Sequence, residues 1–303
     1  MAKLIQDSKK IGYIPTVIDN SADNHPVFRR SDRDFQAFPE IVCYHVDRVL
    51  GIYRKPVILS RVLTNKILYA HFAWFPNWDI GRIYRSITYK LRYYSPEYNI
   101  FVSLQPWMDG LANKPPSNSV RDFLLLDARI IPQQQYQLRK ELITVSNTLV
   151  FDFLVDEHDR KAEKNWVVSS NGTQLLWDNG LAFDHGPYGR YSCLDILCGH
   201  NTWRAGKQAK CDRICRFSVD MYQKLLELSK SSYTLGERVR DHLQSDLLFP
   251  LFQFARYEHY KDDKYPVSFK IENFWQGLDQ RVETLLEHIG RCISLHGSDV
   301  VFM

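Results

Sequence analysis

The 303-residue sequence lacks several features that would assign it quickly to a class of protein. No run of about 18 apolar residues occurs, so a membrane-spanning helix of the usual length is not encoded. The first residues, MAKLIQDSKKIGYIP, contain no apolar core and are not a secretory signal peptide. The net charge of +4 is diffuse, without a Lys/Arg block, and nucleic-acid binding is not indicated. No internal repeat or low-complexity segment is present.

The composition is that of a folded globular protein. Hydrophobic residues make up 45% and charged residues 24% of the chain, which excludes a largely disordered protein. The length suffices for one large domain or for two lobes.

Cysteine is sparse but clustered. The six cysteines include Cys193, Cys198, Cys211 and Cys215, spaced as C-x4-C and C-x3-C, and a further one at Cys292. We expect a disulfide-stabilised loop over 187–215, with a zinc site or free thiols as alternatives, because zinc sites prefer closer cysteine pairs. Asn171-Gly172-Thr173 is an N-glycosylation sequon.

Hydrophobic periodicity predicts the order of the elements. Residues 1–35 are polar, and we expect irregular structure there. Asn171-Gly172 between two apolar runs is the strongest short-range signal for a β-hairpin. The other predicted elements are a helix over 38–50, strands over 56–63, 66–75 and 99–107, a long helix over 137–155, and helices over 219–230, 235–255 and 277–297.

This order predicts an α+β fold with two lobes, as in kinase-like enzymes. A small strand-bearing N-lobe would span 1–107 and contain the helix over 38–50. A larger helical C-lobe would span 108–303 and contain the segment 156–183, the cysteine-rich loop and the C-terminal helices.

The segment 156–183 carries the residues that suit phosphoryl transfer. Asp159 follows the long helix, Asn165 precedes the hairpin, and Asp178 follows it. A hairpin brings Asn165 and Asp178 to the same end, where an amide and a carboxylate oxygen could bind one metal ion. An ordinary acidic surface turn is the alternative. We expect Arg160 to pair with a nearby carboxylate and to hold this segment in place.

"VFDFLVDEHDR" followed by "WDNGLAF" resembles the secretory-pathway kinases, a family that includes four-jointed, the Golgi casein kinase and the glycosaminoglycan xylose kinase. "PEIVCYHVDRVLGIYRKPVILSRV", "NIFVSLQPWMDGL", "CRFSVDMYQKLLEL" and "LDQRVETLLEHIGRCISLHG" are similar to further stretches of that family. The resemblance covers about residues 36–297.

The resemblance implies roles for particular residues. Asp159 would be the catalytic base, and Asp178 a metal ligand together with Asn165 or Glu163. Glu40 would pair with the lysine that holds the nucleotide phosphates. Disulfides, with Cys215 and Cys292 at matching positions, ATP with Mn²⁺ or Mg²⁺, a location in the Golgi lumen or outside the cell, and a secreted or extracellular-domain protein or glycan as substrate also follow from it.

Residues 1–39 contain no G-x-G-x-x-G motif, and Lys3 and Lys9 or Lys10 are the lysines that precede Glu40. We therefore regard Lys3 and Lys10 as the candidates for the phosphate-binding lysine. The missing motif has two explanations: the sequence begins after a signal anchor and the first strands, or the nucleotide lid has been lost.

Three functions fit the sequence. The first is an ATP- and metal-dependent kinase, similar to four-jointed, that phosphorylates Ser/Thr of proteins, or glycans, in the secretory pathway. The second is a pseudokinase that binds and regulates a related kinase. The third is a cytoplasmic lipid kinase, because "DR…NW…DNGLAF" also resembles type II phosphatidylinositol kinases.

Overall fold

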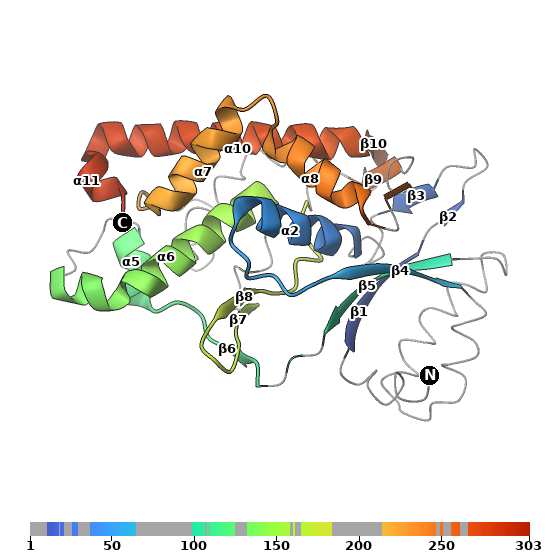
Figure 1. Ribbon diagram of the computed structural model, residues 1–303, viewed down its shortest axis with the longest axis horizontal. Coiled ribbons are helices and arrows are strands. Elements are labelled where there is room, and N and C mark those ends of the chain that lie inside the picture. Colours follow the sequence, from blue (N-terminus) through green and yellow to red (C-terminus); the bar gives the residue numbers. More distant parts are fainter. Residues whose placement is uncertain are drawn as a thin grey trace.

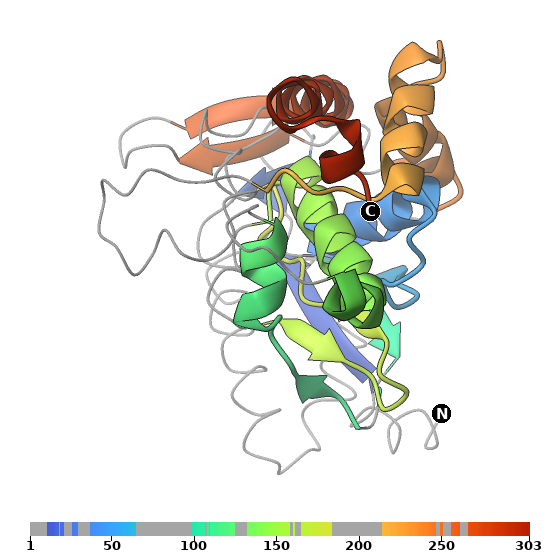
Figure 2. The same ribbon diagram turned by 90° about the vertical axis from the view of Figure 1, so that its left-hand side faces the viewer.

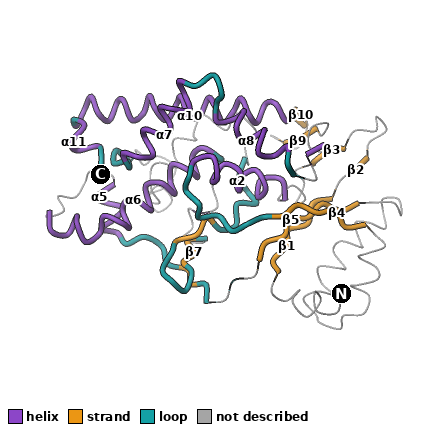
Figure 3. Tube along the Cα trace, in the orientation of Figure 1, coloured by secondary structure: helices purple, strands orange, loops and turns teal. Residues whose placement is uncertain are grey.

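The computed structural model describes residues 11–17, 19–20, 26–29, 37–64, 99–106, 108, 110–124, 132–157, 160, 165–183, 214–246, 249–250, 256–260 and 266–303. Helices gather on one side of the molecule and most strands on the other (Figure 1, Figure 3). This arrangement is the α+β, kinase-like fold expected from the sequence. Among the described residues, no helix is both long and apolar enough to cross a membrane.

The helical part is built around α10 (Ile271–His296). α7 (Val219–Lys230), α8 (Leu235–Gln244) and α6 (Pro132–Leu154) pack against it. α2 (Ala37–Leu50) lies between α8 and the strand β5 (Asn99–Pro106) and so joins the helical part to a sheet. Leucine, valine and phenylalanine side chains of these helices form one continuous buried core.

Three small sheets complete the fold. β1 (Ile11–Val17), β5 and β4 (Leu59–Thr64) form an antiparallel sheet in the order β1-β5-β4. β6 (Ala112–Asn113), β7 (Trp166–Val168) and β8 (Gln174–Leu176) form a second antiparallel sheet. In the third, β3 (Pro26–Arg29) lies between β2 (Asp19–Asn20) and β9 (Arg256–Tyr260), and β9 also pairs with β10 (Pro266–Lys270).

The chain ends below α11 and beside α7, near one end of the helical part (Figure 1). α5 (Asn118–Leu124) and α11 (Ser298–Val301) are short helices. Directly after α11, Phe302 pairs with Phe217 in a parallel bridge. Viewed along α10, the β9–β10 pair lies on one side of that helix and α7 on the other (Figure 2).

Several predicted elements are confirmed with shifted ends. The helix over 38–50, the strand over 99–107, the hairpin and the helix over 219–230 are present as α2, β5, β7–β8 and α7. The predicted helices over 137–155 and 277–297 begin earlier, at Pro132 and Ile271. The predicted strand over 56–63 begins at Leu59, and the one over 66–75 lies outside the described residues.

Two predictions were wrong. Residues 1–35 are not uniformly irregular, because β1 pairs along its whole length with β5. The helix expected over 235–255 is interrupted: α8 ends at Gln244, where the hydroxyl of Ser245 donates to the carbonyl of His242, and residues 249–250 are helical again.

Candidate active site

The site begins where α6 ends. Asp152, in the last turn of α6, accepts a backbone hydrogen bond of 2.8 Å from Glu157 at its carbonyl oxygen, and Asp156 turns the chain with a φ of 54°. The other end of the segment returns to the same place, because the Phe183 amide donates to the carbonyl of Val155 at 2.7 Å. The stretch from the helix end to the residues after the hairpin is thus closed into a loop.

Arg160 fastens this loop from inside. Its Nε donates to both carboxylate oxygens of Asp152, at 3.0 and 2.7 Å. Its Nη1 donates to the backbone carbonyls of Asn165, at 2.7 Å, and Trp177, at 3.2 Å. Burial alone would lower the pKa of Arg160, but the carboxylate of Asp152 raises it above the ordinary value. The predicted pairing of Arg160 with a nearby carboxylate is confirmed.

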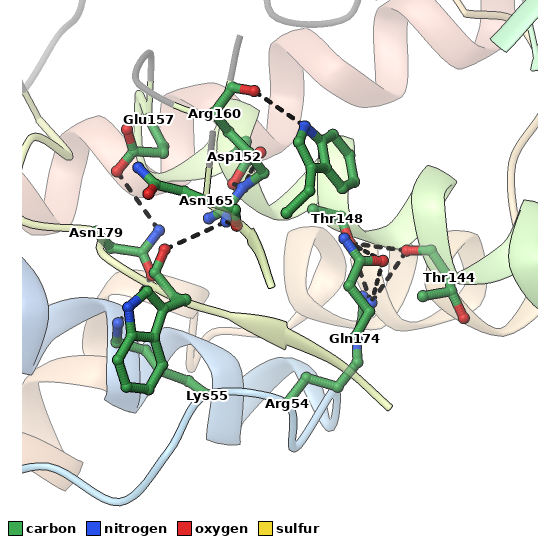
Figure 4. Close-up of polar contacts among 12 residues, drawn as sticks. Arg54, Lys55, Thr144, Thr148, Asp152, Glu157, Arg160, Asn165, Gln174 and Asn179 are labelled. Carbon is green, nitrogen blue, oxygen red and sulfur yellow. Dashed lines mark hydrogen bonds and ion pairs between the residues drawn. The ribbon is translucent and has the colours of Figure 1, made fainter. Parts of the chain in front are cut away.

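The hairpin brings Asn165 and Asp178 to one end, as the sequence predicts. Trp166 is paired with Leu176, so Asn165 directly precedes one strand and Asp178 follows the other by two positions. Both have left-handed backbone conformations, with φ of 62° and 51°. Asn165 is partly buried and Asp178 is exposed. Figure 4 shows Asn165 next to Asp152 and Arg160.

A buried ion pair lies beside this end of the hairpin. Lys55 Nζ donates to Glu40 Oε2 at 2.5 Å, and neither side chain is exposed to solvent. Glu40 also accepts from Gln105 Nε2 at 3.2 Å. Lys55 Nζ donates in addition to Asn179 Oδ1 at 2.8 Å, and Asn179 Nδ2 donates to Glu157 Oε2 at 3.4 Å.

Asn179 therefore connects the ion pair to the loop that follows α6 (Figure 4). Asn179 directly follows Asp178, so a buried cation and an exposed carboxylate lie at adjacent positions of the same site. Such a combination suits a phosphate group bound together with a metal ion.

The sequence did not reveal Lys55. We expected the partner of Glu40 among lysines that precede it, whereas the structure places the partner 15 residues after it, in the loop behind α2. The only feature of the sequence that could have indicated Lys55 is its position directly before Pro56 and a largely apolar strand. A lone lysine at such a position becomes buried only if it has a partner.

Several residues singled out from the sequence lie outside the described residues. They are Lys3, Lys10, Asp159, Glu163, Cys193, Cys198 and Cys211. The described residues closest in sequence to Asp159 are Glu157 and Arg160, and both are buried.

One of the expected disulfides is present, between Cys215 and Cys292. It ties the segment before α7 to the last turns of α10. His288 lies next to it, with Nε2 2.9 Å from the carbonyl oxygen of Ile214. Because the two sulfur atoms are bonded to each other, these cysteines are not the thiolate ligands that the zinc alternative would need. Cys43 is a buried free thiol on α2.

The sequon residue Asn171 lies in the exposed turn of the hairpin. Its Oδ1 accepts from the hydroxyl of Ser169 at 2.6 Å and from the amide of Thr173 at 3.1 Å. Gly172 next to it has a φ of 82°, which explains why Asn-Gly predicted this turn.

The comparisons with known proteins agree with this fold. Two similar solved structures are hydra Fam20 with sugar and the Golgi casein kinase with Mn/ADP bound. The first has a TM-score of 0.54 and 15% identity, covering 97% of this chain and 81% of that one. The second has a TM-score of 0.56 and 14% identity, covering 100% and 78%. At these identities the likeness concerns the fold. The search among curated proteins finds no match.

The family model described as "Golgi casein kinase, C-terminal, Fam20" matches residues 126–301, which is more than half of the chain. The matched range contains α6, the hairpin, the disulfide and α10. It agrees with the resemblance drawn from the sequence motifs. The chain therefore belongs to the Golgi casein kinase (Fam20) family.

Proposed function

We propose that this chain is a kinase that transfers the terminal phosphate of ATP, with a divalent metal ion, to a hydroxyl group of a secretory-pathway protein or glycan. The observation that carries the proposal is the fully buried ion pair between Lys55 and Glu40 at the end of the hairpin that presents Asp178. Removing two charges from water is costly, and their attraction alone often does not offset that cost. A cation fixed in this way serves to hold an anionic ligand.

Lys55 is the residue proposed to bind the nucleotide phosphates. Glu40 and Asn179 both accept hydrogen bonds from its Nζ, so the ammonium group is held in one place before a nucleotide arrives. Fixing charge in advance is the main contribution of a protein to phosphoryl transfer.

Asp178 and Asn165 are the proposed metal ligands, with Glu163 as a further candidate. Their carboxylate and amide oxygens are donors that Mn²⁺ and Mg²⁺ accept. Arg160 donates to the carbonyl of Asn165 and to that of Trp177, which directly precedes Asp178, and so links the two positions. The bound metal ion would neutralise charge on the phosphates. The related Golgi casein kinase structure has Mn/ADP bound, which supports Mn²⁺ as the metal.

Asp159 is the proposed base that receives the proton of the acceptor hydroxyl. It stands between Glu157, which Asn179 connects to Lys55, and Arg160, which is anchored to Asp152. Both Glu157 and Arg160 are buried.

The acceptor and the compartment follow from the family. We propose a protein Ser/Thr or a glycan hydroxyl as acceptor, in the Golgi lumen or outside the cell. The disulfide between Cys215 and Cys292 supports this compartment, since disulfides persist in oxidising environments. The family match favours this proposal over the lipid-kinase alternative.

The experiment is a phosphate-transfer assay with ATP, Mn²⁺ and a panel of secreted acidic proteins, peptides and glycans. Asp178→Asn removes the carboxylate charge with little change in shape, and we expect it to lower the rate by about 100-fold or more. Lys230→Ala, an exposed lysine on α7, is the control and should leave the rate unchanged. Nucleotide binding without transfer by the unaltered chain would contradict the proposal and favour the pseudokinase.

A further inference from the structure

A pocket lies toward the turn of the hairpin, and neither Asn165 nor Asp178 lines it. Its volume is about 410 Å³, within the range of about 300–1,000 Å³ that is usual for small-molecule sites. Arg54, the first half of α6, the segment around Lys114 and the hairpin residues around Gly172 line it. Lys55, Glu40 and Asp178 are not among its lining residues.

The pocket is lined by more positive than negative charge. Arg54, Lys114 and Lys140 are its cations, and Glu141 is its one carboxylate, so the lining carries a net charge of +2. Lys114 and Lys140 are exposed and form no ion pair with any described residue. Arg54 follows α2, Lys114 follows β6 and Lys140 lies on α6, and all three line the same pocket.

Arg54 is a partly buried cation whose guanidinium group has no carboxylate at hydrogen-bond distance among the described residues. Its Nη1 donates to the carbonyl of Thr144 at 3.1 Å, the hydroxyl of Thr148 at 3.0 Å and Gln174 Oε1 at 3.5 Å, all of which are neutral oxygens. Its Nη2 is buried without a hydrogen-bond partner. The carboxylate of Asp47 contacts the Arg54 backbone amide and the side chain of Arg48 instead.

Burial lowers the pKa of Arg54 to about 10, and the attraction of Asp47 compensates only in part. Among the residues that the structure describes, no carboxylate lies at hydrogen-bond distance from this guanidinium group. Its Nη2 also has no acceptor.

Gln174 shows the same deficit. It is only 8% exposed, and its Nε2 is buried without an acceptor. Its Oε1 lies 3.5 Å from Arg54 Nη1, which places the side chain of Gln174 next to the guanidinium group (Figure 4). Buried N–H groups in proteins are almost always hydrogen-bonded. Two unpaired donors on adjacent side chains that line one pocket therefore indicate a missing acceptor, and the positive lining indicates that it is an anion.

We propose that this pocket binds the phosphate, sulfate or carboxylate group of a small molecule. Arg54 and Gln174 donate to the anionic group from the buried side, and Lys114 and Lys140 contribute charge from the exposed side. Val145 and Trp166 also line the pocket, and both are nearly fully buried. This site is separate from the one proposed for phosphate transfer.

The test is isothermal titration calorimetry of the whole chain with inorganic phosphate, sulfate and acetate, against chloride at the same ionic strength. The Lys114→Ala/Lys140→Ala variant should bind the preferred anion about tenfold more weakly. Lys230→Ala/Arg291→Ala removes the same charge from exposed positions on α7 and α10 and should bind as the unaltered chain does. Equal affinities in both double variants would overturn the proposal.

Gln174→Glu tests the buried side of the pocket. The new carboxylate has the shape of the amide, pairs with Arg54 and supplies the missing negative charge, so we expect anion binding to fall at least tenfold while the melting temperature does not decrease. Anion binding that survives this substitution would place the anion elsewhere, for instance at Lys55, and would overturn the proposal. If Gln174→Glu does not fold, the exposed lysine variant decides.

The same titrations distinguish the sources of the anionic group. Inorganic phosphate and glucose 6-phosphate share the group but differ in the body attached to it, and glucose alone lacks the group. Tighter binding of glucose 6-phosphate than of inorganic phosphate, lost in Lys114→Ala/Lys140→Ala, would support an organic ligand. Equal binding of glucose and glucose 6-phosphate would contradict the requirement for an anion.

Discussion

Lys55 Nζ and Glu40 Oε2 lie 2.5 Å apart, with both side chains fully buried between α2 and the hairpin. Gln105 also donates to Glu40, and Asn179 also accepts from Lys55, so each charge has a second partner. The pair joins the helix α2 to the segment that carries Asp178. The folding of this region and the proposed chemistry therefore depend on the same contact, and the two effects have to be measured separately.

Lys55→Met should destabilise the fold by about 3–5 kcal/mol, because it leaves the Glu40 carboxylate buried without its cation. Adding Glu40→Gln to Lys55→Met removes that charge, and the free energy of unfolding should return to within about 1 kcal/mol of the unaltered chain. Urea denaturation of the two variants measures both values. A double variant as unstable as the single one would show that the pair is not the reason for the loss.

The contact between Arg160 and Asp152 should matter as much for stability. Asp152→Asn leaves the buried guanidinium without its carboxylate, and we expect a loss of about 3–5 kcal/mol. Glu227→Gln provides the comparison, because Glu227 is exposed on α7 and solvent screens its ion pairs with Lys224 and Arg238, so we expect a much smaller loss. Equal losses in the two variants by urea denaturation would contradict the anchoring role of Arg160.

Glycine at 236 is required by the close approach of α8 to α10. A Cβ there would collide with the backbone carbonyl of Trp275, and the Gly236 amide donates to Asp279 Oδ1 at 2.8 Å. Gly236→Ala should therefore cost about 1–3 kcal/mol. Gly290→Ala on α10 meets no atom within 4 Å and should stabilise the chain by about 1 kcal/mol, as alanine does in an exposed helix. Thermal unfolding of both variants shows whether each substitution raises or lowers the stability. A stabilising Gly236→Ala would contradict the close packing.

His45 should make the fold less stable in mild acid. Burial, followed by the neighbouring His242 and Arg48, lowers its pKa to about 4. Because the unfolded chain binds the proton more tightly, stability falls as the pH drops from about 6.5 towards 4, by about 1 kcal/mol at pH 5.5. His45→Gln should remove this part of the pH dependence in urea titrations at pH 7.5 and 5.5. His296→Gln, at an exposed position of α10, should retain it. An unchanged pH dependence in His45→Gln would contradict the assignment.

The sequence predicted the parts of the site that depend on local order. Asn171-Gly172 between two apolar runs fixed the hairpin, and the hairpin alone determines that Asn165 and Asp178 meet at one end. The family motifs are contiguous stretches of sequence, so they too could be identified without the structure. Arg160 and its carboxylate are eight residues apart, within reach of a pattern-based prediction.

The contacts that depend on the fold were not predictable in the same way. Lys55 becomes the partner of Glu40 only because the chain turns back along α2 after Leu50, and β5 supplies Gln105 from 65 residues away. The strand β1 contains glycine and proline, and it forms because it pairs with β5 far along the chain. Arg54 and Gln174 are 120 residues apart, and nothing in their local sequence predicts a common pocket.

The central claim is that the Lys55–Glu40 pair serves phosphate transfer and not only folding. The most direct test is Mn²⁺-dependent transfer from ATP by the Lys55→Met/Glu40→Gln variant, under conditions in which circular dichroism shows that it is folded. We predict a rate at least about 100-fold lower than that of the unaltered chain, because the cation that holds the phosphates is absent. A folded double variant that transfers phosphate within a few-fold of the normal rate would contradict the account.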